Sequence, residues 1–301
     1  MDARTDLLPA RAGAARLARR IAAHAVAALV DEAMLTPKPG LVDMRGRGAH
    51  DDLSWPLMCA SACAIGPHFA RMALAGATVA SDTALRRRIG AIGREAERAM
   101  LAASGGVNTH RGAIWALGLL VTAAARPGCG ADPAAIAACA ARLARIADPD
   151  APLRTGHKGE RARLEHGVGG ARGQAQDGFP EVLDHALPML RLARGRGDPE
   201  PQARINALLA VMSRLDDTCL LARGGRPALE ATRRGARRVL AAGGAATPIG
   251  RRLLARLEAR MRALGVSPGG AADLLAAALL LDRIERDTTT MEMEMETSWN
   301  D

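Results

Sequence analysis

The sequence predicts an all-α protein with a single multi-helix domain over residues 13–286. Aromatic residues make up 2% of the 301-residue chain and Tyr is absent. Ala and Leu fill most apolar positions, and both favour helices. Apolar residues recur at three- and four-residue intervals, whereas no alternating pattern typical of strands occurs. With 49% hydrophobic residues and a mean hydropathy of −0.01, the chain can bury a large core.

The first helix is expected over residues 13–35. It ends at the segment Thr36-Pro37-Lys38-Pro39-Gly40, because two prolines and a glycine do not continue a helix. The same periodicity predicts further helices over 54–76, 81–104, 110–125, 132–147, 181–195, 199–221, 226–242, 248–264 and 268–286. A polar stretch over 148–180 is expected to form a long loop. The repetitive residues 287–301 are expected to be a disordered tail.

The net charge of +9 comes almost entirely from arginine, since Lys38 and Lys158 are the only lysines. A basic chain favours anionic partners such as polyphosphates. Nucleic acid is disfavoured as a partner, because the charge forms no basic arm and few aromatic side chains could stack on bases. No signal peptide and no uninterrupted run of about 18 apolar residues is evident, so no membrane partner is expected. Five cysteines, an odd number, favour free thiols and a cytoplasmic protein.

Five glycine-rich polar segments each end against a predicted helix. Such segments expose backbone N–H groups at helix N-termini, where phosphate binds. Each segment alone is more simply a helix stop or cap, but their number and their Arg, Asp and His residues indicate a shared nucleotide site. Neither a P-loop nor a Rossmann fingerprint is present. The adjacent carboxylates of Asp216 and Asp217 would suit Mg²⁺.

Taken in chain order, these segments resemble the triphosphoribosyl-dephospho-coenzyme A synthases over residues 15–285. The motifs are LTPKPGLVD with GAHDDL, GGVNTHRGAIWALGLL, GVGGARGQAQDGFP, DDTCLLARGG and SPGGAADLLAAALLLD. The family has a citrate-lyase branch and a malonate-decarboxylase branch. The sequences NTHRGAIW, GVGGAR and HALPML are more similar to the malonate-decarboxylase branch.

The resemblance implies an all-α enzyme that uses ATP and 3′-dephospho-coenzyme A. Such an enzyme transfers the 5-triphosphoribosyl group of ATP to the ribose 2′-hydroxyl of the acceptor and releases adenine. The product, 2′-(5″-triphosphoribosyl)-3′-dephospho-coenzyme A, would serve a holo-acyl-carrier-protein synthase as the prosthetic-group precursor. The alternatives are the same reaction serving citrate lyase, a Mg²⁺-dependent N-glycosidic hydrolase, and a non-catalytic nucleotide-binding module.

This chemistry needs a proton donor to adenine, a base for the 2′-hydroxyl, and cations that position the triphosphate. Three groups of residues are predicted to supply these functions. The catalytic candidates are His50, Asp52 and His110. The substrate-binding candidates are Lys38, Asn108, Thr109, Arg111, Arg172, Asp217, Arg223 and Gly224, and the Mg²⁺ candidates are Asp43, Asp216 and Asp217.

Four positions depart from the pattern common in the family. Cys219 stands where an Asn is common, Ala222 where a His is common, Gln174 where a Glu is common, and Leu53 where a Met is common. Without the His at position 222, either that side chain is not essential or the activity is impaired.

Overall fold

The all-α prediction is confirmed. The computed structural model describes the backbone of residues 3–152 and 154–298, and side chains within 11–152 and 154–288. In this part of the chain all named elements are helices, and the pairing of Asp43 with Gly46 is an isolated bridge. The elements are α1 (Ala3–Met34), α2 (Trp55–Thr78), α3 (Asp82–Ala103), α4 (Arg111–Ala124), α5 (Pro133–Arg145), α6 (Lys158–His166), α7 (Gly170–Gln176), the π-helix η1 (Glu181–Ala186), α8 (Leu187–Gly195), α9 (Glu200–Met212), α10 (Thr218–Ala241), α11 (Pro248–Ala263) and α12 (Gly269–Ser298).

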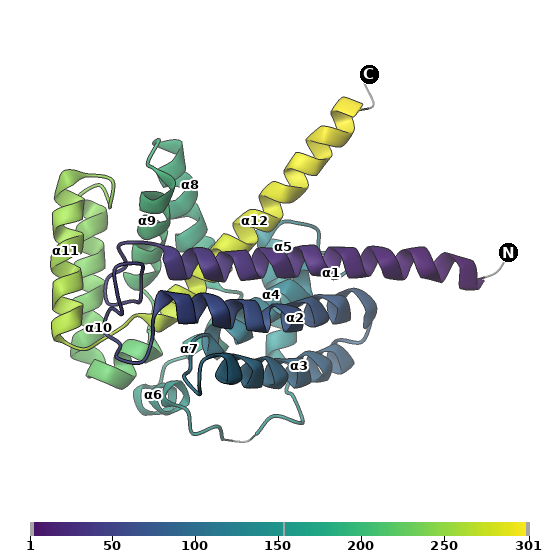
Figure 1. The fold of residues 1–301 in the computed structure, drawn as a ribbon, viewed down its shortest axis with the longest axis horizontal. Helices are drawn as coiled ribbons and strands as arrows, with labels where there is room; N and C mark the ends of the chain where they lie inside the picture. The colour runs from purple at the N-terminus through teal and green to yellow at the C-terminus, as the bar shows by residue number, and fades with distance from the viewer. Residues whose placement is uncertain (1–2, 153, 299–301) are drawn as a thin grey trace.

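The helices surround α4, which is buried along nearly its whole length. Helices α1 and α2 run side by side on one face, and α3 packs beyond α2 (Figure 1). Helix α12 crosses the molecule and packs against α1, α4 and α9, while α10 and α11 form a pair at the other end (Figure 1). The N-terminus of α4 therefore lies inside a ring of other helices, where it can form one wall of a site.

Close contact between α2 and α4 depends on glycine. A Cβ atom built on Gly76 would lie 2.1 Å from the carbonyl oxygen of Thr122. One on Gly118 would lie 2.8 Å from the sulfur of Met72. Larger residues at these positions would push the two helices apart, so the small side chains set their separation.

Four predicted boundaries were wrong. The helix predicted over 199–221 ends at Met212, and α10 begins at Thr218, because the Asp217 side chain accepts N–H groups of the new helix. Helix α10 starts before the predicted residue 226 and bends at Gly225, where φ is 62°. The stretch predicted to be one loop contains α6 and α7. Helix α1 also begins earlier than predicted, at Ala3.

The predicted tail over 287–301 lies mostly outside the residues whose side chains are described. Helix α12 extends to Ser298, and the disorder of the tail stays a prediction.

Within the described residues, α2 is long and apolar enough to cross a membrane by length and composition alone. It packs against α1, α3 and α4, and Ser61, Ile65, Phe69 and Met72 are buried in these contacts. We therefore interpret α2 as a core helix with one exposed face.

Replacing Gly76 with Ala should destabilise the protein by about 1–3 kcal/mol, because the added methyl group collides with the backbone of α4. Gly13→Ala is the matched control: no atom lies within 4 Å of the added Cβ, and Ala favours the helix by about 1 kcal/mol. Urea denaturation of both variants measures the free energy of unfolding. Equal stabilities would contradict the close contact at Gly76.

Candidate active site

The N-terminus of α4 brings together residues from three parts of the sequence. His110, which immediately precedes the helix, lies with its Nδ1 atom 3.2 Å from the Ser61 hydroxyl on α2. That hydroxyl is 2.6 Å from the hydroxyl of Thr109. His110 is 2% exposed, and burial, followed by the nearby charge of Lys38, lowers its pKa to about 4. The imidazole is therefore neutral at pH 7, and its buried Nε2 atom has no described hydrogen-bond partner.

Asp273 on α12 lies directly against the first turn of α4. A Cβ atom on Gly112 would be 2.0 Å from the Asp273 Oδ2 atom, so only glycine leaves room for the carboxylate. The backbone N–H of Ala113 donates to Asp273. Burial, followed by the charges of Glu32 and Asp217, raises the pKa of Asp273 well above its usual value. The site thus contains a carboxyl group that holds its proton more tightly than usual.

Asp217 connects the N-termini of α10 and α12. Its Oδ1 atom accepts the backbone N–H of Cys219 at 2.8 Å in α10, and its Oδ2 atom accepts that of Ala271 at 3.0 Å in α12. The side chain is 2% exposed. Both oxygens therefore bind backbone N–H groups at helix starts, which are not open to phosphate as predicted from the glycine-rich segments. Burial raises the pKa of Asp217, and these hydrogen bonds oppose the rise.

Lys38 is buried and paired inside the protein. Its Nζ atom lies 2.5 Å from a Glu32 carboxylate oxygen and also donates to the Glu32 carbonyl. The backbone N–H of Lys38 donates to Asp43, which is also buried and accepts from Arg45. Because Lys38 is 2% exposed, its charge acts on neighbouring groups such as His110 rather than on the solvent.

His50 and Arg223 form a second cluster beside the first. The Arg223 guanidinium donates to His50 Nδ1 at 3.1 Å and to the Ala49 carbonyl at 3.0 Å. Burial, then the charge of Arg223, lowers the pKa of His50 to about 4. Since arginine can only donate, His50 Nδ1 accepts and Nε2 carries the proton. The Nε2–H group of His50 can therefore donate a hydrogen bond, but it has no lone pair with which to act as a base. The Asp52 carboxylate lies 3.8 Å from His50 Nδ1.

Arg111 and Arg172 approach the α4 N-terminus from different sides. Arg111 pairs with Glu97 of α3 at 3.2 Å. Arg172 is exposed on α7, where the neighbouring Ala171 carbonyl accepts from Trp115 at 3.2 Å. Trp115 lies one turn beyond Arg111 on α4. Arg111 thus lies at the start of α4, whereas Arg172 lies close to Arg86, whose pKa is lowered by burial and also by the charge of Arg172.

The structure brings together many of the predicted residues, but not all. Lys38, His110, Thr109 and Asp217 form the inner cluster, while His50, Asp52 and Arg223 form the second. Arg223 of the second cluster is close enough to Cys219 for its charge to act on the pKa of that thiol. Because the backbone N–H of Cys219 binds Asp217 of the inner cluster, the two clusters are neighbours.

Asn108 accepts the backbone N–H of Arg111 and so shapes the start of α4. Gly224 permits close packing, because a Cβ there would lie 2.5 Å from Ala228.

The three aspartates predicted to bind Mg²⁺ do not meet. Asp216 is exposed and pairs with Arg233 at 2.8 Å. The Asp43 side chain accepts the backbone N–H of Lys38. The Asp217 side chain accepts backbone N–H groups at the starts of two helices. The described residues hold no group of three or more His, Cys, Asp or Glu side chains that could bind a metal ion. The arrangement therefore does not fit a resident Mg²⁺ ion.

Sequence reasoning missed Glu32, Ser61 and Asp273. Asp273 stood in the quoted motif SPGGAADLL and could have been singled out as the acidic residue of a glycine-rich helix start. Glu32 and Ser61 lie inside amphipathic helices, where no local signal separates them from ordinary helix residues.

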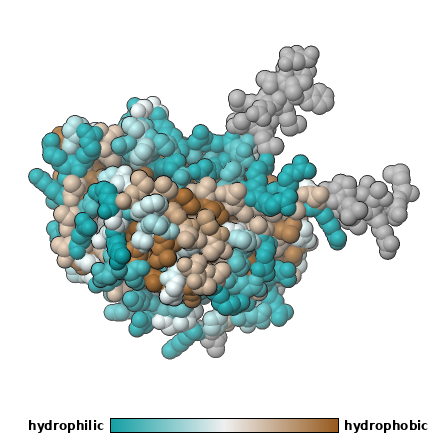
Figure 2. Space-filling model, in the orientation of Figure 1, coloured by the Kyte–Doolittle hydropathy of each residue, from teal (hydrophilic) through white to brown (hydrophobic). Residues whose placement is uncertain are grey.

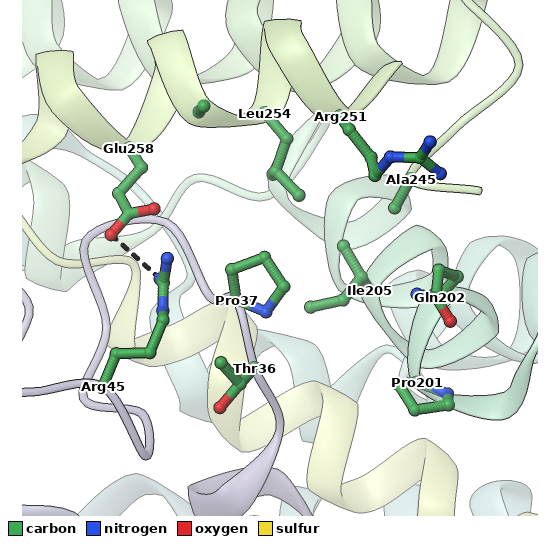
Figure 3. A pocket seen from close by; sticks show the side chains of 11 residues that line it. Thr36, Pro37, Arg45, Pro201, Gln202, Ile205, Ala245, Arg251, Leu254 and Glu258 are labelled. Atoms are coloured by element: carbon green, nitrogen blue, oxygen red, sulfur yellow. Dashed lines mark hydrogen bonds and ion pairs between the residues drawn. The ribbon is translucent and has the colours of Figure 1, made fainter. Parts of the chain in front are cut away.

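A cavity of about 130 Å³ lies on the other side of the segment that contains Lys38. Thr36 and Pro37 form one wall, and Leu254 of α11 and Ile205 of α9 face them (Figure 3). The pair Arg45–Glu258, at 2.9 Å, borders the cavity. None of the predicted site residues lines it.

Comparison with known proteins identifies the class of protein to which this fold and site belong. The model of the ATP:dephospho-CoA triphosphoribosyl transferase family matches residues 18–290. The chain therefore belongs to this family of transferases, and it is an enzyme.

Among curated relatives, a protein from Klebsiella pneumoniae named 2-(5″-triphosphoribosyl)-3′-dephosphocoenzyme-A synthase is 54% identical over 264 residues, covering 88% of this chain and 94% of its own. A probable synthase of the same name from Azotobacter vinelandii is 54% identical over 270 residues, covering 89% and 92%. One from Pseudomonas fluorescens Pf-5 is 55% identical, with the same coverage. No solved structure matches the chain.

The neutral His110 should make stability depend on pH. Its pKa lies near 4 in the folded protein and near 6.5 in the unfolded chain, so the unfolded chain binds more protons between these values. Stability is fully present above pH 6.5 and falls as the pH approaches 4, by about 3 kcal/mol from this group. Urea denaturation at pH 7 and pH 4.5 should show a smaller difference for His110→Gln than for the wild type. An unchanged difference would contradict this assignment.

Proposed function

We propose that the enzyme transfers the 5-triphosphoribosyl group of ATP to the ribose 2′-hydroxyl of 3′-dephospho-coenzyme A and releases adenine. The family match over residues 18–290 carries this proposal. The cluster of Lys38, His110, Asp217 and Asp273 supports it, because motifs spread over the whole chain converge there on three helix N-termini. The N–H groups at these helix starts bind Asp217 and Asp273, so we assign the polyanionic triphosphate to arginine side chains.

Asp273 is our candidate for the group that accepts the 2′-hydroxyl proton. Of the three neighbouring carboxylates, Glu32 is paired with Lys38, and Asp217 binds the N–H groups of two helices. Asp273 is the least buried of the three. A raised pKa brings a carboxyl group closer to the range in which it works as a base.

In the proposed reaction, the bond between the ribose C1′ of ATP and adenine N9 breaks, and a bond forms between C1′ and the acceptor oxygen. The hydroxyl proton passes to the Asp273 carboxylate, and adenine leaves with the bonding electrons and takes up one proton from solvent, to which Asp273 later returns the proton that it accepted. We assign His50 Nε2–H as the donor of a hydrogen bond to the departing base. Arg111, Arg172 and Arg223 would contact the triphosphate through their guanidinium groups.

The Mg²⁺ requirement stays a prediction. The aspartates of this chain do not fit a resident ion, and no step of the proposed reaction is routed through one.

We further propose that the product supplies malonate decarboxylase, through a holo-acyl-carrier-protein synthase, in the cytoplasm. The motifs NTHRGAIW, GVGGAR and HALPML support the malonate-decarboxylase branch over the citrate-lyase branch. Decarboxylase genes beside the gene for this chain would agree with this assignment, and citrate-lyase genes would contradict it.

Adenine release should require the acceptor. With ATP and dephospho-coenzyme A, the enzyme should form adenine and the triphosphoribosyl product in equal amounts, as measured by chromatography and mass spectrometry. With ATP alone, adenine should not accumulate. Equal release without the acceptor would instead identify an N-glycosidic hydrolase.

Asp273→Asn should lower kcat by about 10²–10⁴-fold, the usual effect of losing a positioned general base. The KM of the Asp273→Asn enzyme for ATP should change less than its kcat, because we assign binding of the triphosphate to arginines. Asp184→Asn, an exposed aspartate on η1, is the matched control and should keep wild-type kcat. Wild-type kcat in the Asp273→Asn enzyme would remove Asp273 from the reaction.

A further inference from the structure

Helix α2 exposes an apolar face. Its exposed residues lie at intervals of three and four and form one stripe along the helix. An 18-residue window of α2 has a mean hydropathy of 1.2, but only 33% of it is buried. Apolar surface that is continuous over a whole helix indicates an interaction site. The stripe consists of Pro56, Ala60, Cys63, Pro67, Arg71 and Leu74.

Helix α1 extends this face. Ala23 and Met34 are exposed and Val30 is partly exposed on α1, which packs beside α2. Figure 2 shows hydrophobic atoms gathered on the side of the molecule where Figure 1 places these two helices. We call the surface formed by the α2 stripe with Ala23, Val30 and Met34 the α1–α2 face.

The α1–α2 face differs in charge from other surfaces of the protein. Arg71 is the only charged residue among the 24 residues of α2, and Glu95 neutralises it in an ion pair. The pair of helices α10 and α11, by contrast, carries many arginines. Because the chain has a net charge of +9, the α2 stripe, whose single charge is paired, lets two copies approach with less repulsion than a surface rich in arginine.

The size of the face allows a dimer. A helix of 24 residues is about 36 Å long, and two adjacent helices are about 20 Å wide. The residues of the face cover about 28 Å of α2 and about 18 Å of α1, each about 10–12 Å wide, which gives about 500 Å² per copy, or about 1,000 Å² in total. This total lies at the lower limit of about 1,000 Å² for a specific interface.

We propose that the α1–α2 face binds the same face of a second copy, in a two-fold dimer with the two α2 helices antiparallel. The stripe runs from Pro56 to Leu74, so a two-fold axis through its centre passes between Cys63 and Pro67. Small residues at Ala60 and Cys63 let the helices approach to about 8–10 Å. Leu74 of each copy then covers the first turn of α2 in the other, and the surface is isologous.

The dimer is tested by molar mass in solution. Light scattering after gel filtration at about 20 μM protein should give twice the chain mass of 31.4 kDa. Ala60→Arg places two like charges in the interface, and we expect a monomer with wild-type helicity by circular dichroism. Ala259→Arg, at an exposed position of α11, is the matched control and should remain a dimer. A monomeric wild type, or a dimeric Ala60→Arg variant, would overturn the proposal.

Cys63 offers a second test that needs no disruptive substitution. Cys63 is exposed, whereas the other four cysteines are buried or partly buried. In the proposed dimer the two Cys63 residues lie close to the two-fold axis. A short bismaleimide should join the two chains in the wild type and not in Cys63→Ser. If the wild type is instead monomeric, is not joined and sediments with phosphatidylcholine vesicles, the face binds lipid and the dimer is refuted.

Discussion

The buried carboxylate of Asp217 determines how the site is assembled. It accepts N–H groups from the first turns of α10 and α12, two helices that are separated by about 50 residues in the chain. A buried carboxylate without such partners would be strongly unfavourable, so the two helix ends must stay together. Because α12 also carries Asp273 against Gly112, the same contact positions the second acid beside α4. Loss of Asp217 would therefore separate three helix N-termini at once.

The electrostatic balance of the inner cluster follows from this packing. Glu32, Asp217 and Asp273 lie near one another, and Lys38 provides the buried cation. Burial, followed by the negative charges of Glu32 and Asp217, raises the pKa of Asp273 and makes its carboxylate a stronger base. Burial keeps the neighbouring His110 neutral. The cluster thus combines a neutral imidazole, a carboxyl group of raised pKa and a buried ion pair, with Arg223 nearby.

Two departures from the family pattern have a structural explanation. The Cys219 thiol lies against Gly269, where a Cβ would be 2.9 Å from its sulfur, and burial raises its pKa. It therefore acts as a small packing group and not as a nucleophile. Ala222 is exposed one residue before Arg223. A histidine at position 222 would lie on the surface next to Arg223. Because this position is exposed, the absence of the histidine leaves the buried cluster intact.

The sequence alone determined the fold class, most of the helices and the family, because helical periodicity and glycine-rich motifs are local properties of the chain. Local pattern also selected Lys38, His110 and Asp217, which the structure brings near one another, and their part in the reaction stays a prediction. Only the tertiary structure decided what these residues do. It paired Lys38 with Glu32, turned Asp217 into a shared helix cap, separated Asp216 from it and brought Asp273 beside Gly112. Such partners come from distant helices, and periodicity shows that a helix has a buried face without showing which side chain meets it.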